Sequence, residues 1–174
     1  MSSRGAPWPP IPKEIKDEAN SQTYQIGKLL GKGGFAKVHA FTPVHVKQDR
    51  NTGQYHKVLG NVVAGKIVAR MLLTKAHQKE KMHQEIELHK SLTHPNIVQF
   101  YHNFITTEFV IITLELCAKR SLMELHKRRG KILEPEARFY MSQVQKGVIG
   151  LGFVGNLVHR STDFLRLFTP EIGS

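Results

Sequence analysis

The chain has 174 residues, 40% of them hydrophobic, with 25 lysines and arginines against 14 acidic residues and a formal net charge of +11. This length corresponds to about one domain that can bury a core, and a single cysteine, Cys117, excludes an internal disulfide framework. The longest aliphatic run, residues 109–116, is too short to cross a bilayer and residues 1–12 lack a signal-peptide core, so we expect an intracellular protein without membrane contact.

The first part of the chain is expected to form strands. Residues 1–22 are rich in proline and charge and predict a disordered lead-in. Residues 24–41 contain two apolar runs on either side of a glycine-rich turn, which is typical of a hairpin. Residues 43–61 have a turn signal and little periodic hydrophobicity, so we interpret them as a long connection. A third strand is predicted over residues 62–69.

The rest of the chain mixes a sheet with helices. Residues 77–92 predict a helix whose apolar side contains Met82, Ile86 and Leu92. Two strands are expected near residues 97–104 and 109–116, which completes an antiparallel sheet of five strands, and helices are expected at 121–129 and 134–151. The last helix has an apolar stripe formed by Ala137, Tyr140, Met141, Val144, Val148 and Leu151.

A glycine-rich segment and two misplaced charges are the candidates for chemistry. The segment from Gly31 to Val38 could let backbone N–H groups close over phosphate oxygens, although such a hairpin is more often only a turn. Strand alternation places Lys66 on the apolar face with Val62, Ala64 and Val68, where a lone ammonium group is costly.

Glu85 presents the same problem on the following helix. Its carboxylate projects between Met82, Ile86 and Leu92 on the face expected to be buried. Either side chain is long enough to carry its charge to solvent, and this is the favoured interpretation when Lys66 or Glu85 is considered singly. The two together favour an ion pair between Lys66 and Glu85.

Five quoted blocks carry a resemblance to a known family. "LLGKGGFAKV", "VAGKIV", "HQEIELHKSLTHPNIVQFYHNF", "LELCAKRSLMELHKRR" and "EPEARFYMSQV" resemble consecutive parts of a protein kinase, specifically the polo-like serine/threonine kinases, over residues 23–146. The resemblance implies an α+β fold: a kinase small lobe and hinge at 23–116, with a five-stranded antiparallel sheet and one prominent helix, then the first helices of an incomplete large lobe at 117–174. The connection at 43–61 is longer than in the family.

The resemblance also implies an ATP site. Its nucleotide-binding residues are Leu30, Gly31, Lys32, Gly33, Gly34, Val38, Ala64, Lys66, Glu85, Leu114, Glu115 and Cys117. The glycine loop would cover the phosphates, and Lys66, paired with Glu85, would hold the α- and β-phosphates. Leu30, Val38 and Ala64 would roof the adenine, with Leu114 behind it and the backbone of Glu115 and Cys117 forming the hinge hydrogen bonds.

The catalytic loop departs from the family pattern. Where the family has "HRDLKLGNLF", residues 159–168 are "HRSTDFLRLF", so Ser161 occupies the position of the catalytic aspartate and Arg166 that of the magnesium-binding asparagine. A neutral hydroxyl is a poor base, and a guanidinium repels a metal ion. The resemblance therefore implies no intact catalytic residue, no bound magnesium and weak ATP binding. The chain also stops before the family's metal-binding loop.

Two functions of different classes remain open from the sequence. The chain is either an ATP-dependent serine/threonine kinase by family, inactive as it stands, or a non-catalytic pseudokinase fragment that binds a protein partner through the nucleotide pocket or its exposed large-lobe helices. The net charge alone would also fit nucleic acid, but no aromatic platform accompanies it, so we do not expect that partner.

Overall fold

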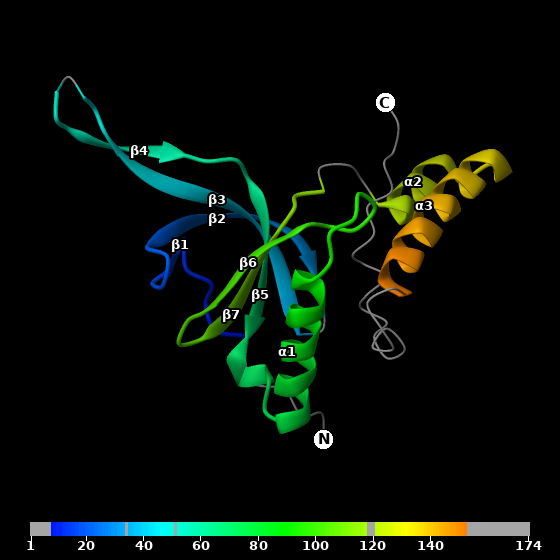
Figure 1. Cartoon of the computed structure of the whole chain (residues 1–174), viewed down its shortest axis with the longest axis horizontal. Coiled ribbons are helices and arrows are strands. Elements are labelled where there is room, and N and C mark those ends of the chain that lie inside the picture. The colour runs from blue at the N-terminus through cyan, green and yellow to red at the C-terminus, as the bar shows by residue number, and fades with distance from the viewer. Residues whose placement is uncertain (1–7, 34, 51, 118–120, 153–174) are drawn as a thin grey trace. The chain divides into compact units, whose positions relative to one another are not determined.

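The computed structural model describes residues 8–33, 35–50, 52–117 and 121–152 (Figure 1). The chain divides into two compact units, each described by itself below. The first unit contains the chain up to Glu87 together with Tyr101–Leu116, and the second contains Leu88–Phe100 and the chain from Cys117 onward.

An antiparallel sheet with one long helix builds the first unit. The strands are β1 (Glu14–Asp17), β2 (Gln22–Lys32), β3 (Ala36–Gln48), β4 (Tyr55–Leu59), β5 (Val63–Ala69), β6 (Phe100–Ile105) and β7 (Phe109–Leu114). A short 3-10 turn, η1 (Arg70–Leu72), precedes helix α1 (Ala76–Lys90), in which Ile86 is buried. The strand order is β1-β2-β3-β5-β7-β6, with β4 paired to β3. The expected α+β fold class is confirmed.

Two strands correct the expected count of five. β1 lies inside residues 1–22, which the sequence predicted to be a disordered lead-in; its residues alternate, with Ile15 and Asp17 buried and their neighbours exposed. Charged residues occupy three of its four positions, so composition hides this period of two.

β4 lies inside the expected long connection at 43–61 and forms a hairpin with the far end of β3. The turn is closed by hydrogen bonds from the Asp49 N–H to the Gln54 carbonyl at 2.8 Å and from the Gly53 N–H to the Asp49 carbonyl at 2.9 Å. Gly53 has a φ of 68°, which glycine adopts without the steric cost of a side chain. The expected connection is therefore mostly strand.

The sheet curls around its core. Phe41, Ile67 and Ile111, from three neighbouring strands, have no exposed surface, and they pack in one cluster with Tyr24 and Phe104. The rings of Tyr24 and Phe104 stack with centroids 5.9 Å apart, although β2 and β6 are not neighbours in the strand order. Contact between strands so far apart in the order requires the sheet to bend back on itself.

Two helices follow in the second unit. α2 (Leu122–Arg129) begins at a capping box, in which Ser121 and Glu124 satisfy each other's backbone N–H groups, and ends at Gly130 with a φ of 73°. α3 (Glu134–Gly152) begins with the acids Glu134 and Glu136 in its first turn, where their negative charges interact favourably with the helix dipole and stabilise the helix. In the part of the chain that the structure describes, neither of these helices nor α1 combines the length and apolarity needed to cross a membrane.

The apolar stripe predicted for α3 is only partly correct. Tyr140 is buried and Ala137 and Val144 are half-buried, but Met141 and Val148 are 62% and 44% exposed. The side chain of Leu151 lies outside the described residues. The buried face runs instead through Tyr140, Gln143 and Gly147, which share one side of a helix at spacings of three, four and seven. A polar residue and a glycine therefore occupy positions that a hydrophobicity pattern cannot identify.

Candidate nucleotide-binding site

Four strands place the predicted site residues in register. Gly31 on β2 is opposite Val38 on β3, Val38 is opposite Lys66 on β5, and Lys66 is opposite Ile112 on β7. Residues directly opposite each other in a sheet share a face. This row therefore aligns the glycine segment with the lysine across the sheet.

A second row lies two residues away. Ala64 on β5 is opposite Leu114 on β7, and both are buried, with 8% and 9% of their surface exposed. Strand alternation places Ala64 on the same face as Lys66, and it places Leu114 on the same face as Ile112. Val38, Ala64, Lys66 and Leu114 thus share one face of the sheet.

Leu30 lies at an irregularity in β2. The pairing jumps from Leu29 opposite His39 to Gly31 opposite Val38, so Leu30 is the extra residue of a β-bulge. Bulges change the direction of a side chain and often occur near functional sites. The side chain of Leu30 is 41% exposed.

The glycine-rich turn is open to an incoming group. The Gly33 N–H donates to the Ala36 carbonyl at 2.8 Å, and Lys32 pairs with Lys37 as the last rung of the hairpin. A Cβ atom built on Gly31 would meet no protein atom within 4 Å. The space beside Gly31 is therefore not required by the packing of the protein, which fits a close approach by a phosphate chain. Gly34 lies outside the described residues.

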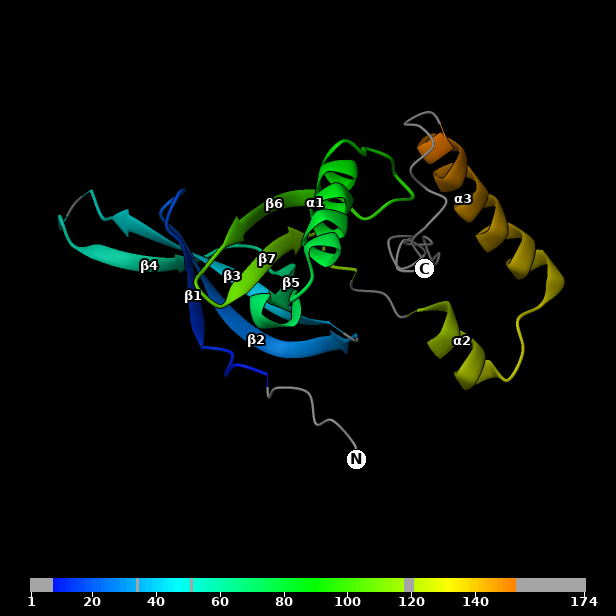
Figure 2. The same cartoon turned by 90° about the horizontal axis from the view of Figure 1, so that it is seen from below.

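The lysine and the glutamate meet. Lys66 Nζ donates to Glu85 Oε1 at 2.8 Å, and this contact joins β5 to helix α1 (Figure 2 shows both elements). The side chains are 24% and 28% exposed. This partial burial makes an unpaired charge costly while still allowing a ligand to reach the ammonium group.

The two residues predicted to form the hinge belong to different units. Glu115 follows β7 in the first unit and is half-buried, whereas Cys117 belongs to the second unit and is exposed. Ser161 and Arg166 lie outside the described residues. Within residues 8–152 as described, no three histidine, cysteine, aspartate or glutamate side chains gather to hold a metal ion.

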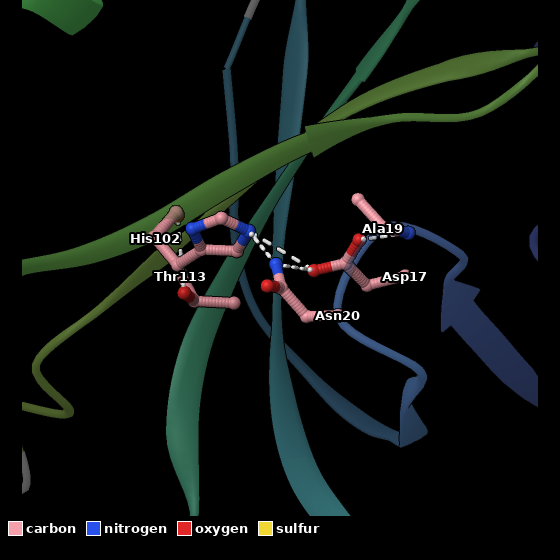
Figure 3. A network of polar contacts seen from close by, with 5 residues as sticks. All are labelled: Asp17, Ala19, Asn20, His102 and Thr113. Carbon is pink, nitrogen blue, oxygen red and sulfur yellow. Dashed lines mark hydrogen bonds and ion pairs between the residues drawn. The ribbon is translucent and has the colours of Figure 1, made fainter.

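Sequence reasoning missed a polar cluster between β1 and β6, the two end strands of the sheet. Asp17 at the end of β1 lies 3.0 Å from His102 Nε2 on β6, and Asn20 donates to the same Asp17 oxygen at 2.8 Å (Figure 3). The Thr113 hydroxyl donates to the His102 carbonyl at 3.1 Å. Aspartate and histidine separated by 85 positions give no sequence signal, because their contact depends on the curl of the sheet.

Comparison with known proteins identifies the family of the chain. The protein kinase domain family matches residues 24–161, and the chain belongs to this family. It is 44% identical over 163 residues to serine/threonine-protein kinase plk-2 of Caenorhabditis elegans, and 41% identical over 162 residues to serine/threonine-protein kinase polo of Drosophila melanogaster. It is 39% identical over 163 residues to serine/threonine-protein kinase PLK2 of Mus musculus.

These alignments cover most of this chain and a small part of each relative. They include 94%, 93% and 94% of the chain but 24%, 26% and 22% of the three relatives, respectively. The chain therefore spans about a quarter of the length of the curated relatives it matches. The similarity is to polo-like kinases, as the quoted sequence blocks indicated.

Proposed function

We propose that this chain is a polo-like kinase small lobe that binds ATP through the row from Gly31 to Lys66 and that does not transfer phosphate as it stands. The observation that carries the nucleotide site is the 2.8 Å contact between Lys66 and Glu85. In protein kinases such a pair positions the lysine on the α- and β-phosphates. We also propose an intracellular location, which rests on the composition and on the relatives' class.

The fit to a nucleotide rests on features of the described residues. Val38, Ala64 and Leu114 give an apolar face, Lys66 adds one cation held in place by Glu85, and Gly31 leaves open space where a side chain would stand. An apolar surface with a few positioned polar groups is typical of a cofactor site. These residues would hold and orient the bound ATP.

Inactivity is the second part of the proposal and rests on the sequence of the catalytic loop. Ser161 and Arg166 stand where the family has the base and a magnesium ligand. Without these groups neither the substrate hydroxyl nor the metal is positioned, and we expect ATP to bind weakly and without help from magnesium.

A titration tests the nucleotide site. A fluorescent ATP analogue is titrated into the purified chain and into Lys66→Met, Glu85→Gln and Lys79→Met, with and without magnesium. We expect Lys66→Met to weaken binding about tenfold or more, because a hydrogen bond between charged groups is lost. Lys79 is exposed on α1 and is the matched control for loss of one charge. Equal affinity in Lys66→Met and the parent would contradict the site, and strong enhancement by magnesium would contradict the missing metal ligands.

A non-catalytic scaffold is the alternative, and one observation favours it. On α3, Phe139, Met141 and Ile149 are 50%, 62% and 57% exposed, which is unusual for large apolar side chains in one helix. The same titration separates the two functions. If no nucleotide binds at all, the exposed surface of α3 remains as the functional surface, and a protein partner becomes the expected ligand.

A further inference from the structure

The far ends of β3 and β4 form a two-stranded ribbon that extends beyond the rest of the sheet (Figures 1 and 2). β3 pairs with β5 only from Ala36 to Phe41, and its pairing with β2 ends at Val44. From His45 to Gln48 it pairs with β4 alone among the described strands. We call residues 45–48 with β4 the ribbon. The ribbon falls within residues 43–61, which the sequence predicted to be a connection longer than in the family.

The backbone at one edge of the ribbon is available for pairing. The Pro43 carbonyl accepts from the Gly60 N–H at 2.7 Å and so faces the β4 side, whereas the Val44 carbonyl accepts from Gln22 Nε2 at 3.1 Å and faces the β2 side. Backbone groups of successive residues point to alternate edges of a strand. Val46 and Gln48 therefore present their N–H and C=O groups to the edge that β2 no longer covers, where an extended segment can add as a strand.

The two faces of the ribbon differ in chemistry. Val46 is opposite Lys57 and Gln48 is opposite Tyr55, so these residues share a face with Leu59. Val46, Tyr55 and Leu59 on this face are 65%, 70% and 57% exposed. The other face carries His45, Lys47 and His56, all exposed. The face of Val46, Tyr55 and Leu59 is thus mainly apolar, although Lys57 also lies on it, and the other face is basic.

A cavity lies where an added strand would end. It has a volume of about 370 Å³ and is lined by Ser21 and the first residues of β2, by His45, Val46 and Lys57 of the ribbon, and by Glu14. A strand that continued the line of β2 along β3 would run antiparallel to β3, and its C-terminal residues would enter this cavity. Because an acid, Glu14, and a base, Lys57, both line the cavity, the entering residues should be neutral.

We propose that the ribbon binds an extended acidic peptide segment of another protein, which adds as a strand to the free edge of β3. Its acidic side chains would alternate with apolar ones, because residues two apart on a strand share a face. The acids would lie beside His45 and Lys47 of β3, and the apolar side chains beside Val46. The charge favours this occupant over a second copy of the chain, whose net charge of +11 would oppose self-association.

The probe is a fluorescein-labelled, C-terminally amidated peptide, Val-Glu-Ile-Glu-Val-Glu-Thr-Thr, titrated into the full 174-residue chain by fluorescence anisotropy. A second peptide has the same composition but carries its three glutamates side by side. We expect the alternating peptide to bind at least about fivefold more tightly, because only it can place its acids on one face of an added strand. Equal binding of the two peptides would indicate charge attraction without strand addition and would overturn the proposal.

Two variants separate backbone pairing from charge. Val46→Pro removes an N–H that faces the open edge and is not used in the ladder with β4, so we expect the fold to persist and peptide binding to fall at least about fivefold. Lys47→Glu should weaken binding similarly, while Lys79→Glu, an equal charge change on α1, should not. Urea unfolding checks that each variant is folded. Binding unaffected by Val46→Pro, or formation of a dimer by sedimentation with no peptide binding, would overturn the proposal.

Discussion

The Asp17 carboxylate on β1 lies 3.0 Å from the Nε2 atom of His102 on β6, and these strands stand at the two ends of the strand order. The Asp17 side chain is 2% exposed, so the contact is sheltered from water on the carboxylate side. Asn20 adds a hydrogen bond to the same oxygen at 2.8 Å. This cluster joins the two end strands of the curled sheet.

We predict that Asp17→Asn lowers the free energy of unfolding by about 1–3 kcal/mol, because it replaces the buried charged acceptor of Asn20 and His102 with a neutral amide. Burial by itself raises the pKa of the Asp17 carboxyl, but hydrogen bonds from Asn20 and the charge of His102 outweigh burial and leave the pKa below its ordinary value of 3.8. A lowered pKa gives stability that is fully present above the unfolded-state pKa and is lost as the pH falls through the folded-state value.

The measurement is urea unfolding of the parent and of Asp17→Asn from about pH 6 to about pH 3. The difference between them should be full at the upper end and shrink below about pH 4. Glu18→Gln is the control, since Glu18 is 78% exposed in its pair with Lys16 and should change stability little. A difference that stays constant down to the lowest pH would contradict the assigned role of the Asp17 charge.

We predict that Gly65→Ala destabilises the first unit by about 1–3 kcal/mol or more, through overpacking. A Cβ atom at position 65 would overlap the ring of Phe41, which has no exposed surface and cannot move aside easily. Gly31→Ala is the matched control because its Cβ would meet no protein atom within 4 Å. Urea unfolding should therefore give a clearly lower free energy of unfolding for Gly65→Ala than for Gly31→Ala. Equal free energies would show that the core around Phe41 can rearrange to accept the added methyl group.

The open space beside Gly31 gives a prediction for binding instead of stability. We expect Gly31→Val to unfold at nearly the same urea concentration as the parent but to bind a fluorescent ATP analogue several-fold more weakly, because the branched side chain fills the space proposed for phosphates. Lys28→Met, an exposed change on the same strand, should leave binding unchanged. Unaltered binding by Gly31→Val would mean that the nucleotide does not pass close to this glycine.

Much of the fold was predictable where hydrophobic patterning is strong. β5 and β7 are apolar runs with turn signals on both sides, and the sequence predicted both within a few residues. Lys66 and Glu85 were paired from sequence because each is a charge on an apolar face, and such a charge requires a partner.

The rest depended on long-range packing. β1 was missed because three of its four residues are charged, and β4 because its pattern is weak without β3 beside it. Asp17 gives no sign of burial, since aspartate is usually exposed and its partner His102 comes close only through the curl of the sheet. The buried face of α3 was predicted incorrectly because Gln143 and Gly147, which are not hydrophobic side chains, lie on it. In each case the strand, the burial or the buried face depends on tertiary contacts, which the local residue types do not reveal.

The last prediction concerns catalysis by the 174-residue chain. A positioned general base contributes about 10²–10⁴-fold in rate, and a metal clamp on the phosphates adds electrostatic stabilisation. Ser161 and Arg166 stand at the positions of these groups. We therefore expect no detectable phosphate transfer from radiolabelled ATP to casein or to a serine peptide in acidic context. Ser161→Asp alone should restore nothing, because Arg166 would still repel a magnesium ion. Transfer by the parent chain that disappears in Lys66→Met would contradict the proposed inactivity and show that this chain is an active kinase.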